Sequence, residues 1–430
     1  MTGLKTMGSY DVIIIGGGSA GLMAGVAAGR QGSRVLLLDK GDKLGRKLGI
    51  SGGGRCNVTN NKELEDLVRN IPGNGRFLYS ALSQFSNRDI VRFFEELGIA
   101  LKEEDNGRMF PVTDKAKTVV EALVREVRNL GVEIRVNAPV DRVLYEADRV
   151  AGVRLRNGET VRSSAVVVAV GGKSVPHTGS EGDGYAWAEE AGHTITPLYP
   201  TEVPITSPEP FIRGRELQGL SLRDVVLTVW NERGKPIVSH RGDLLFTHFG
   251  VSGPIALRCS QFVVKQLAKG EGFSPVLLTV DLMPDLSVQE VYGQTLKLAE
   301  DAPKKAVSNA LKGFVPERML PLLFQAAELD PHVTYDHIPR QRWQELSNRI
   351  KAFPVRADGT LSIEEAFVTG GGVHLKEIDP KSMMSKRKRG LFFCGEILDV
   401  HGYTGGYNIT AAFTTGHAAG THAAALALEE

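Results

Sequence analysis

The chain has 430 residues, a formal net charge of +1 and 42% hydrophobic residues. This length allows two or three domains, and a charge near zero gives no overall attraction to nucleic acid or to an anionic membrane. No apolar run approaches the ~20 residues of a membrane span, and the first residues lack the apolar centre of a signal peptide, so we expect a cytoplasmic protein. The three cysteines, Cys56, Cys259 and Cys394, are too scattered to predict a disulfide framework or a metal site.

The first predicted elements are a strand and a helix joined by glycines. Residues 12–15 form an apolar β-branched run that predicts a buried parallel strand, and the alanine-rich residues 19–31 predict a helix. Gly16, Gly18 and Gly21 between them have the spacing G-x-G-x-x-G. Such glycines allow a tight turn, close approach of phosphates and close packing of helix on strand, while the helix N-terminus offers free N–H groups. We therefore expect the pyrophosphate of a dinucleotide at this turn.

A second strand over residues 33–38 ends in Asp39, eighteen residues after Gly21. An acidic side chain at this place can accept hydrogen bonds from the ribose of an adenosine. The same acid disfavours a 2′-phosphate, although Lys40 follows it directly. A glycine-rich turn without a ligand is the alternative interpretation.

Residues 43–60, KLGRKLGISGGGRCNVTN, combine consecutive glycines with cations. The glycines at 52–54 can turn main-chain N–H groups toward a phosphate or a planar ring, and Arg46, Lys47 and Arg55 add positive charge. We interpret the segment as a loop that wraps an anionic, planar ligand. A mobile surface loop is the alternative.

Short strands follow two helical patterns. Helices are expected over residues 87–98 and 115–131, with a short hairpin segment, GRMFPV, between them. Residues 132–169 then read as strands, and the last apolar run, AVVVAV, leads into Gly171 and Gly172. In flavoenzymes with a β-meander crossover, the returning strand reaches the nucleotide at such a glycine pair.

The middle of the chain predicts an insert. Five prolines between residues 197 and 210 indicate that the chain leaves the first domain, and strand-like segments then predict a barrel or sandwich. Residues 286–353 alternate amphipathic helical stretches with prolines, which predicts a small helical part. The basic run 385–389, SKRKR, is typical of a solvated loop.

The last segment, residues 390–420, has the same pattern of strand, glycine-rich turn and helix as residues 12–31. An apolar strand ends at Gly395, a glycine-rich loop follows, and an alanine-rich helix begins near Asn408. Because both ends of the chain carry dinucleotide-binding features, we predict one discontinuous domain, 8–193 and 362–430. The insert is 194–361, with a β-barrel-like part at 194–285, returning strands near 354–361 and helices at 286–353.

Six segments together resemble a bacterial family of NAD(P)/FAD-dependent oxidoreductases, the aminoacetone oxidase-like FAD-binding enzymes. They are DVIIIGGGSAGL, GRKLGISGGGRCNVTN, AVGGKSVPHTGSEGDGYAWA, LFTHFGVSGP, FVTGGGV and CGEILDVHGYTGGYN. The resemblance spans nearly the whole chain. It implies an α/β fold with a Rossmann-type FAD-binding domain of the glutathione reductase and fumarate reductase-like class, interrupted by β-barrel and helical parts. The family includes reductases of unsaturated 3-oxo bile acids and proteins described as amine oxidases.

The resemblance also implies which residues bind FAD. The pyrophosphate would lie on Gly16, Gly18, Ser19, Ala20 and Gly21, and the adenosine on Asp39, Lys40 and the backbone of Val140. The ribityl and flavin region would be lined by Arg46, Lys47, Ser51, Gly52, Arg55 and Cys56, with Ala169, Val170 and Gly171 beside the cofactor. Gly395, Glu396, Asp399, Gly406, Tyr407, Asn408 and Ile409 would close over the ribityl chain and the pyrimidine end of the flavin.

Catalysis requires a hydride path on one face of the flavin ring and, for reduction of an enone, a proton donor. His401 and Tyr403, in the loop that would close over the flavin, and His248 and Arg258, in the insert, are the candidates. A hydrogen-bonded structural histidine is the alternative for each histidine. The alternative role of Cys56 is that of a redox thiol, although no second cysteine lies close in sequence.

The expected function is reduction of a conjugated C=C bond in an apolar carbonyl substrate, with NAD(P)H as donor. No second G-x-G-x-x-G follows Gly21, so the donor has no binding motif of its own. The alternatives are an amine oxidase that passes electrons from an aminoketone to oxygen, and a flavin-binding redox sensor without catalysis. We expect a small-molecule substrate and no nucleic-acid or membrane partner.

Overall fold

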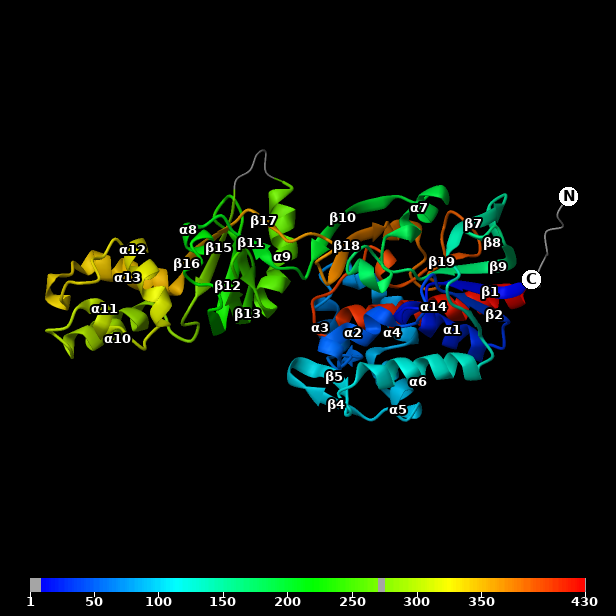
Figure 1. The fold of residues 1–430 in the computed structure, drawn as a ribbon, viewed down its shortest axis with the longest axis horizontal. Coiled ribbons are helices and arrows are strands. Elements are labelled where there is room, and N and C mark those ends of the chain that lie inside the picture. Colours follow the sequence, from blue (N-terminus) through cyan, green and yellow to red (C-terminus); the bar gives the residue numbers. More distant parts are fainter. Residues whose placement is uncertain (1–8, 270–274, 430) are drawn as a thin grey trace. The chain divides into compact units, whose positions relative to one another are not determined.

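The chain forms two compact units in the computed structural model, which describes residues 9–269 and 275–429 (Figure 1). The first unit combines the described residues up to Tyr199 with those from Ile363 onward, and the second is Pro200–Ser362. The start of the insert is predicted from the sequence at residue 194. Residues up to Tyr199 belong instead to the first unit, because β10 (Ile195–Thr201) pairs with β18 (Val368–Val373).

A seven-stranded sheet organises the first unit. Its strands lie in the order β6-β2-β1-β9-β8-β7, and β19 also pairs with β9. The bounds are β1 (Tyr10–Ile15), β2 (Val35–Leu38), β6 (Glu133–Arg135), β7 (Val140–Glu146), β8 (Arg149–Leu155), β9 (Thr160–Val168) and β19 (Leu391–Phe393). The strands β6, β2, β1, β9 and β19 are parallel, whereas β7, β8 and β9 form an antiparallel meander.

The register of the parallel strands brings distant motifs to one edge. Ile15 pairs with both Leu38 and Val168, and Val168 pairs with Phe393, so four strands end level with one another. The segments that follow these strands begin at Gly16, Asp39, Ala169 and Cys394. Ligands of open α/β sheets bind at this carboxyl edge, so the predicted motifs meet where a cofactor is expected.

Two helices pack against each other with almost no space between their backbones. They are α1 (Ser19–Arg30) and α14 (Tyr407–Leu428), which lie together below the sheet in Figure 1. A Cβ atom on Gly416 would lie 2.2 Å from the carbonyl oxygen of Ala20, and one on Gly420 would lie 2.2 Å from that of Ala24. The glycines of the last helix therefore set the distance between two helices whose N-termini face the same site.

A glycine-rich segment expected to be a loop is partly helical. The helix α2 (Arg46–Gly54) begins at Arg46, but it is interrupted at Ser51, which has extended backbone angles. Gly52, Gly53 and Gly54 then adopt φ angles of +57°, +68° and +83°, which side chains other than glycine rarely tolerate. Helical propensity of residues 46–50 explains the first part, and the glycines end it.

The remaining elements of the first unit surround this segment. A small antiparallel sheet has the order β3-β5-β4, with β3 (Thr59–Asn60), β4 (Leu101–Glu104) and β5 (Arg108–Pro111), so the expected hairpin at GRMFPV is present. The helices are α3 (Leu64–Arg69), α4 (Tyr79–Gln84), α5 (Asn87–Glu96), α6 (Ala116–Asn129) and α7 (Asp183–Glu190). No helix among the described residues is both long enough and apolar enough to cross a membrane.

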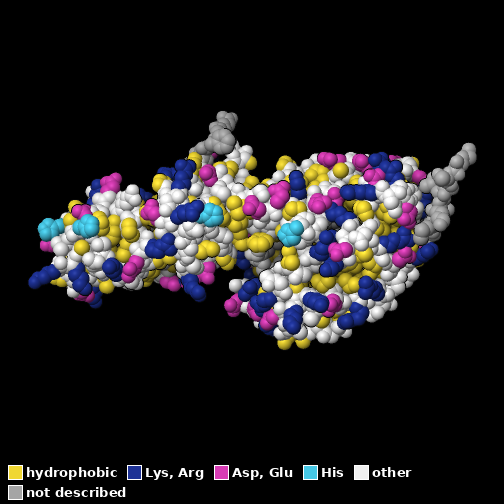
Figure 2. Space-filling view, in the orientation of Figure 1, with side chains coloured by type: hydrophobic (Ala, Val, Ile, Leu, Met, Phe, Trp, Pro, Cys, Tyr) yellow, Lys and Arg dark blue, Asp and Glu magenta, His cyan; other side chains and the backbone are white. Residues whose placement is uncertain are grey.

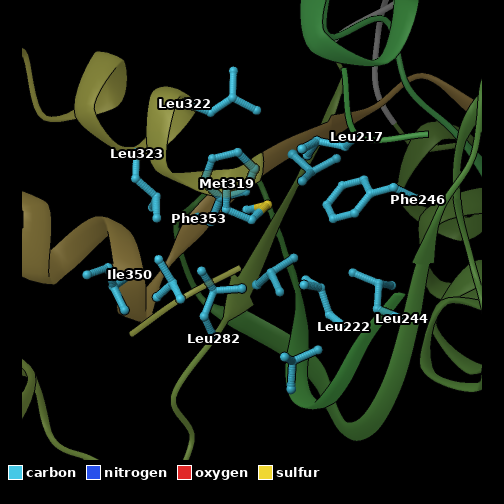
Figure 3. Packing of buried hydrophobic residues seen from close by; sticks show 14 of the residues in the cluster. Leu217, Leu222, Leu244, Phe246, Leu282, Met319, Leu322, Leu323, Ile350 and Phe353 are labelled. Carbon is cyan, nitrogen blue, oxygen red and sulfur yellow. The ribbon is translucent and has the colours of Figure 1, made fainter. Parts of the chain in front are cut away.

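The second unit combines a sheet and helices around one core. Its sheet has the order β16-β15-β12-β13-β14-β11-β17, formed by β11 (Ile205–Thr206), β12 (Ser221–Trp230), β13 (Pro236–Phe246), β14 (Gly250–Ser252), β15 (Val276–Asp281), β16 (Phe353–Ala357) and β17 (Gly359–Thr360). The helices are α8 (Pro210–Arg213), α9 (Pro254–Leu267), α10 (Val288–Glu300), α11 (Val307–Ala310), α12 (Leu320–Ala326) and α13 (Arg340–Lys351). Figure 3 shows Phe246 from the sheet and Met319, Leu323 and Ile350 from the helical part in the same cluster. The strand and helical parts expected from sequence therefore share a core.

Candidate functional site

The three glycines of the first turn differ in what surrounds them. A Cβ on Gly16 would lie 2.5 Å from the carbonyl oxygen of Ala169, and a Cβ on Gly21 would lie 1.8 Å from that of Gly16. A Cβ on Gly18 would have no atom within 4 Å. Gly16 and Gly21 are therefore needed for the protein's own packing, whereas Gly18 faces open space at the N-terminus of α1, where a pyrophosphate would bind.

Asp39 holds the turn by accepting hydrogen bonds from the backbone. The N–H of Gly17 donates to one carboxylate oxygen at 2.8 Å and the N–H of Gly41 to the other at 2.7 Å, while Arg46 lies 3.5 Å away. A carboxylate has about four acceptor positions, so one remains for a ribose hydroxyl. Lys40, in contrast, pairs with Glu181 at 2.6 Å and Asp183 at 2.5 Å, which joins the end of β2 to α7.

The cations of residues 46–55 have different partners. Arg46 covers Gly41, because a Cβ on that glycine would lie 1.9 Å from its guanidinium nitrogen. Arg55 pairs with Glu104 and Asp114, and its guanidinium lies 4.2 Å from the ring centre of Phe110. Its charge is thus compensated by protein groups.

The thiol of Cys56 does not have the properties of a redox thiolate. Cys56 is buried and has a positive φ of 63°, and burial raises the pKa of its thiol to about 12. A reactive cysteine needs a lowered pKa and access to solvent. Cys259 and Cys394 are buried as well, and burial also raises their pKa values.

A polar network surrounds Glu396. Its carboxylate accepts hydrogen bonds from Lys47 Nζ at 2.7 Å, from Ser174 Oγ at 3.0 Å and from the N–H of Thr369 at 2.8 Å. Lys47 Nζ also lies 3.0 Å from Ser174 Oγ. Sequence reasoning selected Lys47 and Glu396 but missed Ser174 and Thr369. The motifs GGKS and FVTGGGV contain them, and only the fold brings these motifs to Glu396.

The N-terminus of α14 is shaped by Gly406 and Asn408. Gly406 has a φ of +95°, and a Cβ there would lie 2.7 Å from the carbonyl of Thr59. The side chain of Asn408 accepts a hydrogen bond from the N–H of Gly402 at 2.7 Å and donates to its carbonyl at 2.8 Å. Tyr407 is buried, and Ile409 is partly exposed in the first turn of the helix. These contacts hold the loop at residues 402–406 in front of the helix.

The predicted adenine and crossover residues lie at the same edge of the sheet. Val140 begins β7, near the point where the N–H of Ala138 donates to the carbonyl of Asp39 at 2.9 Å. Ala169 touches the Gly16 turn, and Val170 follows it. Gly171 has a φ of +76°, and a Cβ there would lie 2.8 Å from Ser180 Oγ.

The four predicted catalytic residues do not lie in one unit. His401 and Tyr403 belong to the first unit, in the loop before α14, and both are buried. His248 and Arg258 belong to the second unit, in the turn between β13 and β14 and on α9. His401 and Tyr403 therefore belong to the same unit as the expected cofactor edge, whereas His248 and Arg258 do not.

One buried hydroxyl near this edge has no partner among residues 9–269 and 275–429. Tyr185 lies on α7 and is 7% exposed, and no described residue forms a hydrogen bond with its Oη. Burial and the negative charges of Glu396 and Asp399 raise the pKa of this hydroxyl, so it remains a neutral donor. Its neighbour Gly184 packs on Ile397 and Val170. Because a buried unpaired hydroxyl is unfavourable, an acceptor on a bound ligand is the natural partner.

These features fit FAD. Gly18 leaves space for phosphates at a helix N-terminus, Asp39 retains an acceptor position for a ribose, and α14 provides a second helix N-terminus behind the glycine-rich loop at 402–406. No group of three or more His, Cys, Asp or Glu side chains in residues 9–269 and 275–429 is placed to hold a metal ion.

Comparison with known proteins identifies the family. A family model described as HI0933-like protein Rossmann domain matches residues 10–422. Ribosomal RNA dihydrouridine synthase of Escherichia coli (strain K12) is 33% identical over 410 residues, which cover 95% of this chain and 96% of that protein. The 3-dehydro-bile acid delta(4,6)-reductase of Clostridium scindens is 29% identical over 416 residues, covering 96% and 98%.

Solved flavoenzymes share the fold. A flavocytochrome c3 fumarate reductase in an open conformation superposes with a TM-score of 0.52 at 19% identity, covering 99% of this chain and 79% of that chain. The 3-ketosteroid delta1-dehydrogenase from Sterolibacterium denitrificans gives 0.51 at 16% identity, covering 98% and 100%. The Rossmann-type fold class and the resemblance predicted from sequence are confirmed. The chain belongs to the HI0933-like protein Rossmann domain family, and it is an FAD-dependent oxidoreductase.

Proposed function

We propose that this enzyme reduces a C=C bond conjugated to a carbonyl group. The names of the two full-length relatives describe this one chemistry on different molecules. Dihydrouridine forms when the ring double bond of a uracil, which lies next to a ring carbonyl, gains two hydrogens. A delta(4,6)-reductase acting on a 3-dehydro bile acid saturates double bonds conjugated to a ketone. This shared reaction is the observation that carries the proposal.

The residues of the first unit can support such a reaction. Bound reduced FAD supplies the hydride. The N-terminus of α14 would stabilise negative charge on a reduced flavin bound near it, with Asn408 fixing the loop in front of the helix, whereas the charge of Lys47 is paired with that of Glu396. The sequence predicts His401 and Tyr403, in the same loop, as candidate donors of the proton that completes the reduction.

A uracil ring in ribosomal RNA is the substrate that the relatives favour. Proteins named ribosomal RNA dihydrouridine synthase from two organisms exceed the bile-acid reductase in identity. The sequence alone predicted no nucleic-acid partner, because the net charge is only +1. On the face in Figure 2, Lys and Arg side chains lie among Asp and Glu. On this face, attraction to RNA would depend on local cations that lie among acidic side chains.

An apolar enone is the second candidate substrate, and the bile-acid reductase supports it. Such a ligand needs an apolar pocket with a few polar groups that polarise its carbonyl. NAD(P)H is the proposed donor for either substrate. FVTGGGV, the other glycine-rich motif, forms the buried strand β18 and not a nucleotide-binding turn, so a nicotinamide would reach the flavin without a second Rossmann site.

The decisive experiment measures the two half-reactions of the purified holoenzyme under anaerobic conditions. NADH and NADPH are tested first for bleaching of the flavin absorbance. The reduced enzyme is then mixed with ribosomal RNA from a strain that lacks the gene, or with 4-androstene-3,17-dione, and flavin reoxidation is followed. We expect rapid reoxidation by the RNA and formation of dihydrouridine, detected by mass spectrometry.

Two other outcomes would change the assignment. Rapid reoxidation only by the steroid would identify the enzyme as an enone reductase of small molecules. Reduction by an aminoketone, followed by rapid reaction with oxygen and release of peroxide, would contradict the proposal and support an amine oxidase.

A further inference from the structure

His401 is too enclosed to meet a substrate directly. Its side chain is 1% exposed, and its backbone pairs in both directions with Gly73, through N–H···O distances of 2.9 and 3.1 Å. A Cβ on Gly73 would lie 2.2 Å from the imidazole ring, so the ring rests directly on this glycine. The imidazole is therefore fixed in orientation.

The imidazole makes one well-defined polar contact on the side of Nε2. The hydroxyl of Tyr199 lies 2.9 Å from His401 Nε2, and the two rings meet edge to face with 5.8 Å between their centres. Tyr199 is partly exposed, unlike His401 and Tyr403. It is thus the member of the pair that a bound molecule can touch.

Tyr199 is held beside the flavin-closing loop by the small sheet of β10 and β18. A Cβ on Gly371 would lie 2.2 Å from the carbonyl of Pro197, and Val373 forms a bridge with Leu398. The strand β18 therefore connects β10, which carries Tyr199, to the segment at Leu398 that precedes His401. Burial and the negative charge of Asp399 raise the pKa of the Tyr199 hydroxyl above its ordinary value of 10.0, so Tyr199 carries its proton at neutral pH.

We propose that Tyr199 is the general acid of the reduction and that His401 is its positioning residue. This inference rests on the proposed function. As a hydride from reduced flavin adds to the carbon farther from the carbonyl, the π electrons of the C=C bond form a C–H bond to the nearer carbon. The O–H bond of Tyr199 breaks in this step. The N–H of His401 Nε2 donates a hydrogen bond to the resulting phenolate, which regains a proton from solvent when product leaves.

Tyr199→Phe tests the acid directly, because it removes one hydroxyl and keeps the ring. With reduced holoenzyme, we expect reoxidation by ribosomal RNA from the deletion strain, or by 4-androstene-3,17-dione, to slow by about 10²–10⁴-fold. FAD content, reduction by nicotinamide and reoxidation by oxygen should stay at wild-type values. Tyr145→Phe is the matched control, because Tyr145 carries a buried hydroxyl on β7, away from this loop.

His401 is tested by a pair of variants. His401→Gln can still place an N–H near Tyr199, whereas His401→Ala cannot and also leaves a cavity next to Gly73. We expect the rate to fall in the alanine variant and to recover in part in the glutamine variant, with an unchanged dissociation constant for substrate in both. If the alanine variant does not fold, the glutamine variant and Tyr199→Phe still decide the question.

The results separate this inference from the proposed function. A wild-type enzyme that neither unsaturated probe reoxidises overturns both. An active wild-type enzyme whose Tyr199→Phe variant reacts at the same rate overturns only the role of Tyr199. Loss of the rate in Tyr403→Phe, with Tyr199→Phe unaffected, would assign the proton to Tyr403 instead.

Discussion

The turn at residues 16–21 and the strand β18 are both glycine-rich, yet Gly18 of the turn has different surroundings from Gly371 and Gly372 of the strand. At Gly18 an added Cβ would meet no atom within 4 Å. At Gly371 it would lie 2.2 Å from the carbonyl of Pro197, and at Gly372 it would lie 2.5 Å from that of Ile397. The first glycine leaves space for a ligand, and the other two leave space for neighbouring backbone. Glycine content alone therefore does not identify a binding site. The atoms that an added Cβ would meet at each glycine distinguish a ligand site from close backbone packing.

The largest expected effect is a loss of stability when a side chain is added to the strand β18. Gly371→Ala should destabilise the protein with or without FAD, because its φ of +79° and the contact with Pro197 both oppose a side chain. Strain of this kind costs about 1–3 kcal/mol before the clash is counted. Gly32→Ala is the matched control, since Gly32 has the same φ of +79° but no atom within 4 Å. Equal melting temperatures for the two variants would contradict the packing role.

Gly18→Val tests whether the open space at Gly18 is the binding site of the pyrophosphate. Gly18 has extended backbone angles, so valine fits the chain, and its side chain would occupy the place of the phosphates. We expect a colourless protein that does not take up added FAD and that melts at the temperature of the wild-type apoprotein. A yellow variant with normal FAD content would refute the assignment of the pyrophosphate site.

A smaller effect on FAD binding is expected at Tyr185. Its hydroxyl, like the open space at Gly18, is proposed to face the ligand and not the protein. Tyr185→Phe should weaken FAD binding by about tenfold, which corresponds to one hydrogen bond. The melting temperature of the apoprotein should stay the same or rise, because the unpaired buried hydroxyl is removed. Titration of apoprotein with FAD and thermal melts of both forms measure these opposite changes.

Tyr145→Phe is the control for this experiment. The hydroxyl of Tyr145 is also buried and has no hydrogen-bond partner in the part of the chain that the structure describes, but it lies on β7 five residues beyond Val140. It should leave FAD affinity unchanged. An equal loss of affinity in both variants would mean that the effect of Tyr185 is not specific.

The smallest effect concerns His193, whose imidazole contacts the buried Ser385 at the start of the basic run 385–389. His193 lies 2.7 Å from Ser385 Oγ and 3.2 Å from Glu377, and burial lowers the pKa of its imidazole below 6.5. The neutral form is therefore favoured in the folded state. Its contribution to stability is present above the unfolded pKa of about 6.5 and is lost as the pH falls below that value.

The sign of this effect can be measured with one variant. Between about pH 7.5 and about pH 5, the wild-type melting temperature should fall, and His193→Gln should reduce this fall. The carboxyl of Glu377, whose pKa Arg387 and Thr194 lower to about 2 against the effect of burial, stays ionised over this range. An unchanged pH dependence in the variant would exclude His193 as the group responsible.

The strands and helix starts at the sheet edge could be predicted from sequence to a large extent, whereas the FAD contacts assigned to their residues stay predictions. The run before Gly16, the acid at Asp39 and the helix that begins near Asn408 are local patterns, since each depends on residues a few positions apart. The same reasoning misjudged residues 46–54, where a helical turn precedes the glycines. The ribose contact assigned to Lys40 stays a prediction, and in the structure Lys40 pairs with Glu181 and Asp183.

What the sequence by itself determined is therefore the cofactor class, the Rossmann-type strands and helices, and the motifs at their ends. Only the tertiary structure decided that Ser174 and Thr369 meet Glu396, and that Tyr199 meets His401. The residues of these pairs are far apart in the chain, and their contacts depend on strand order and register. Such contacts form only when the whole sheet is assembled, because no local pattern of residues encodes which strands become neighbours.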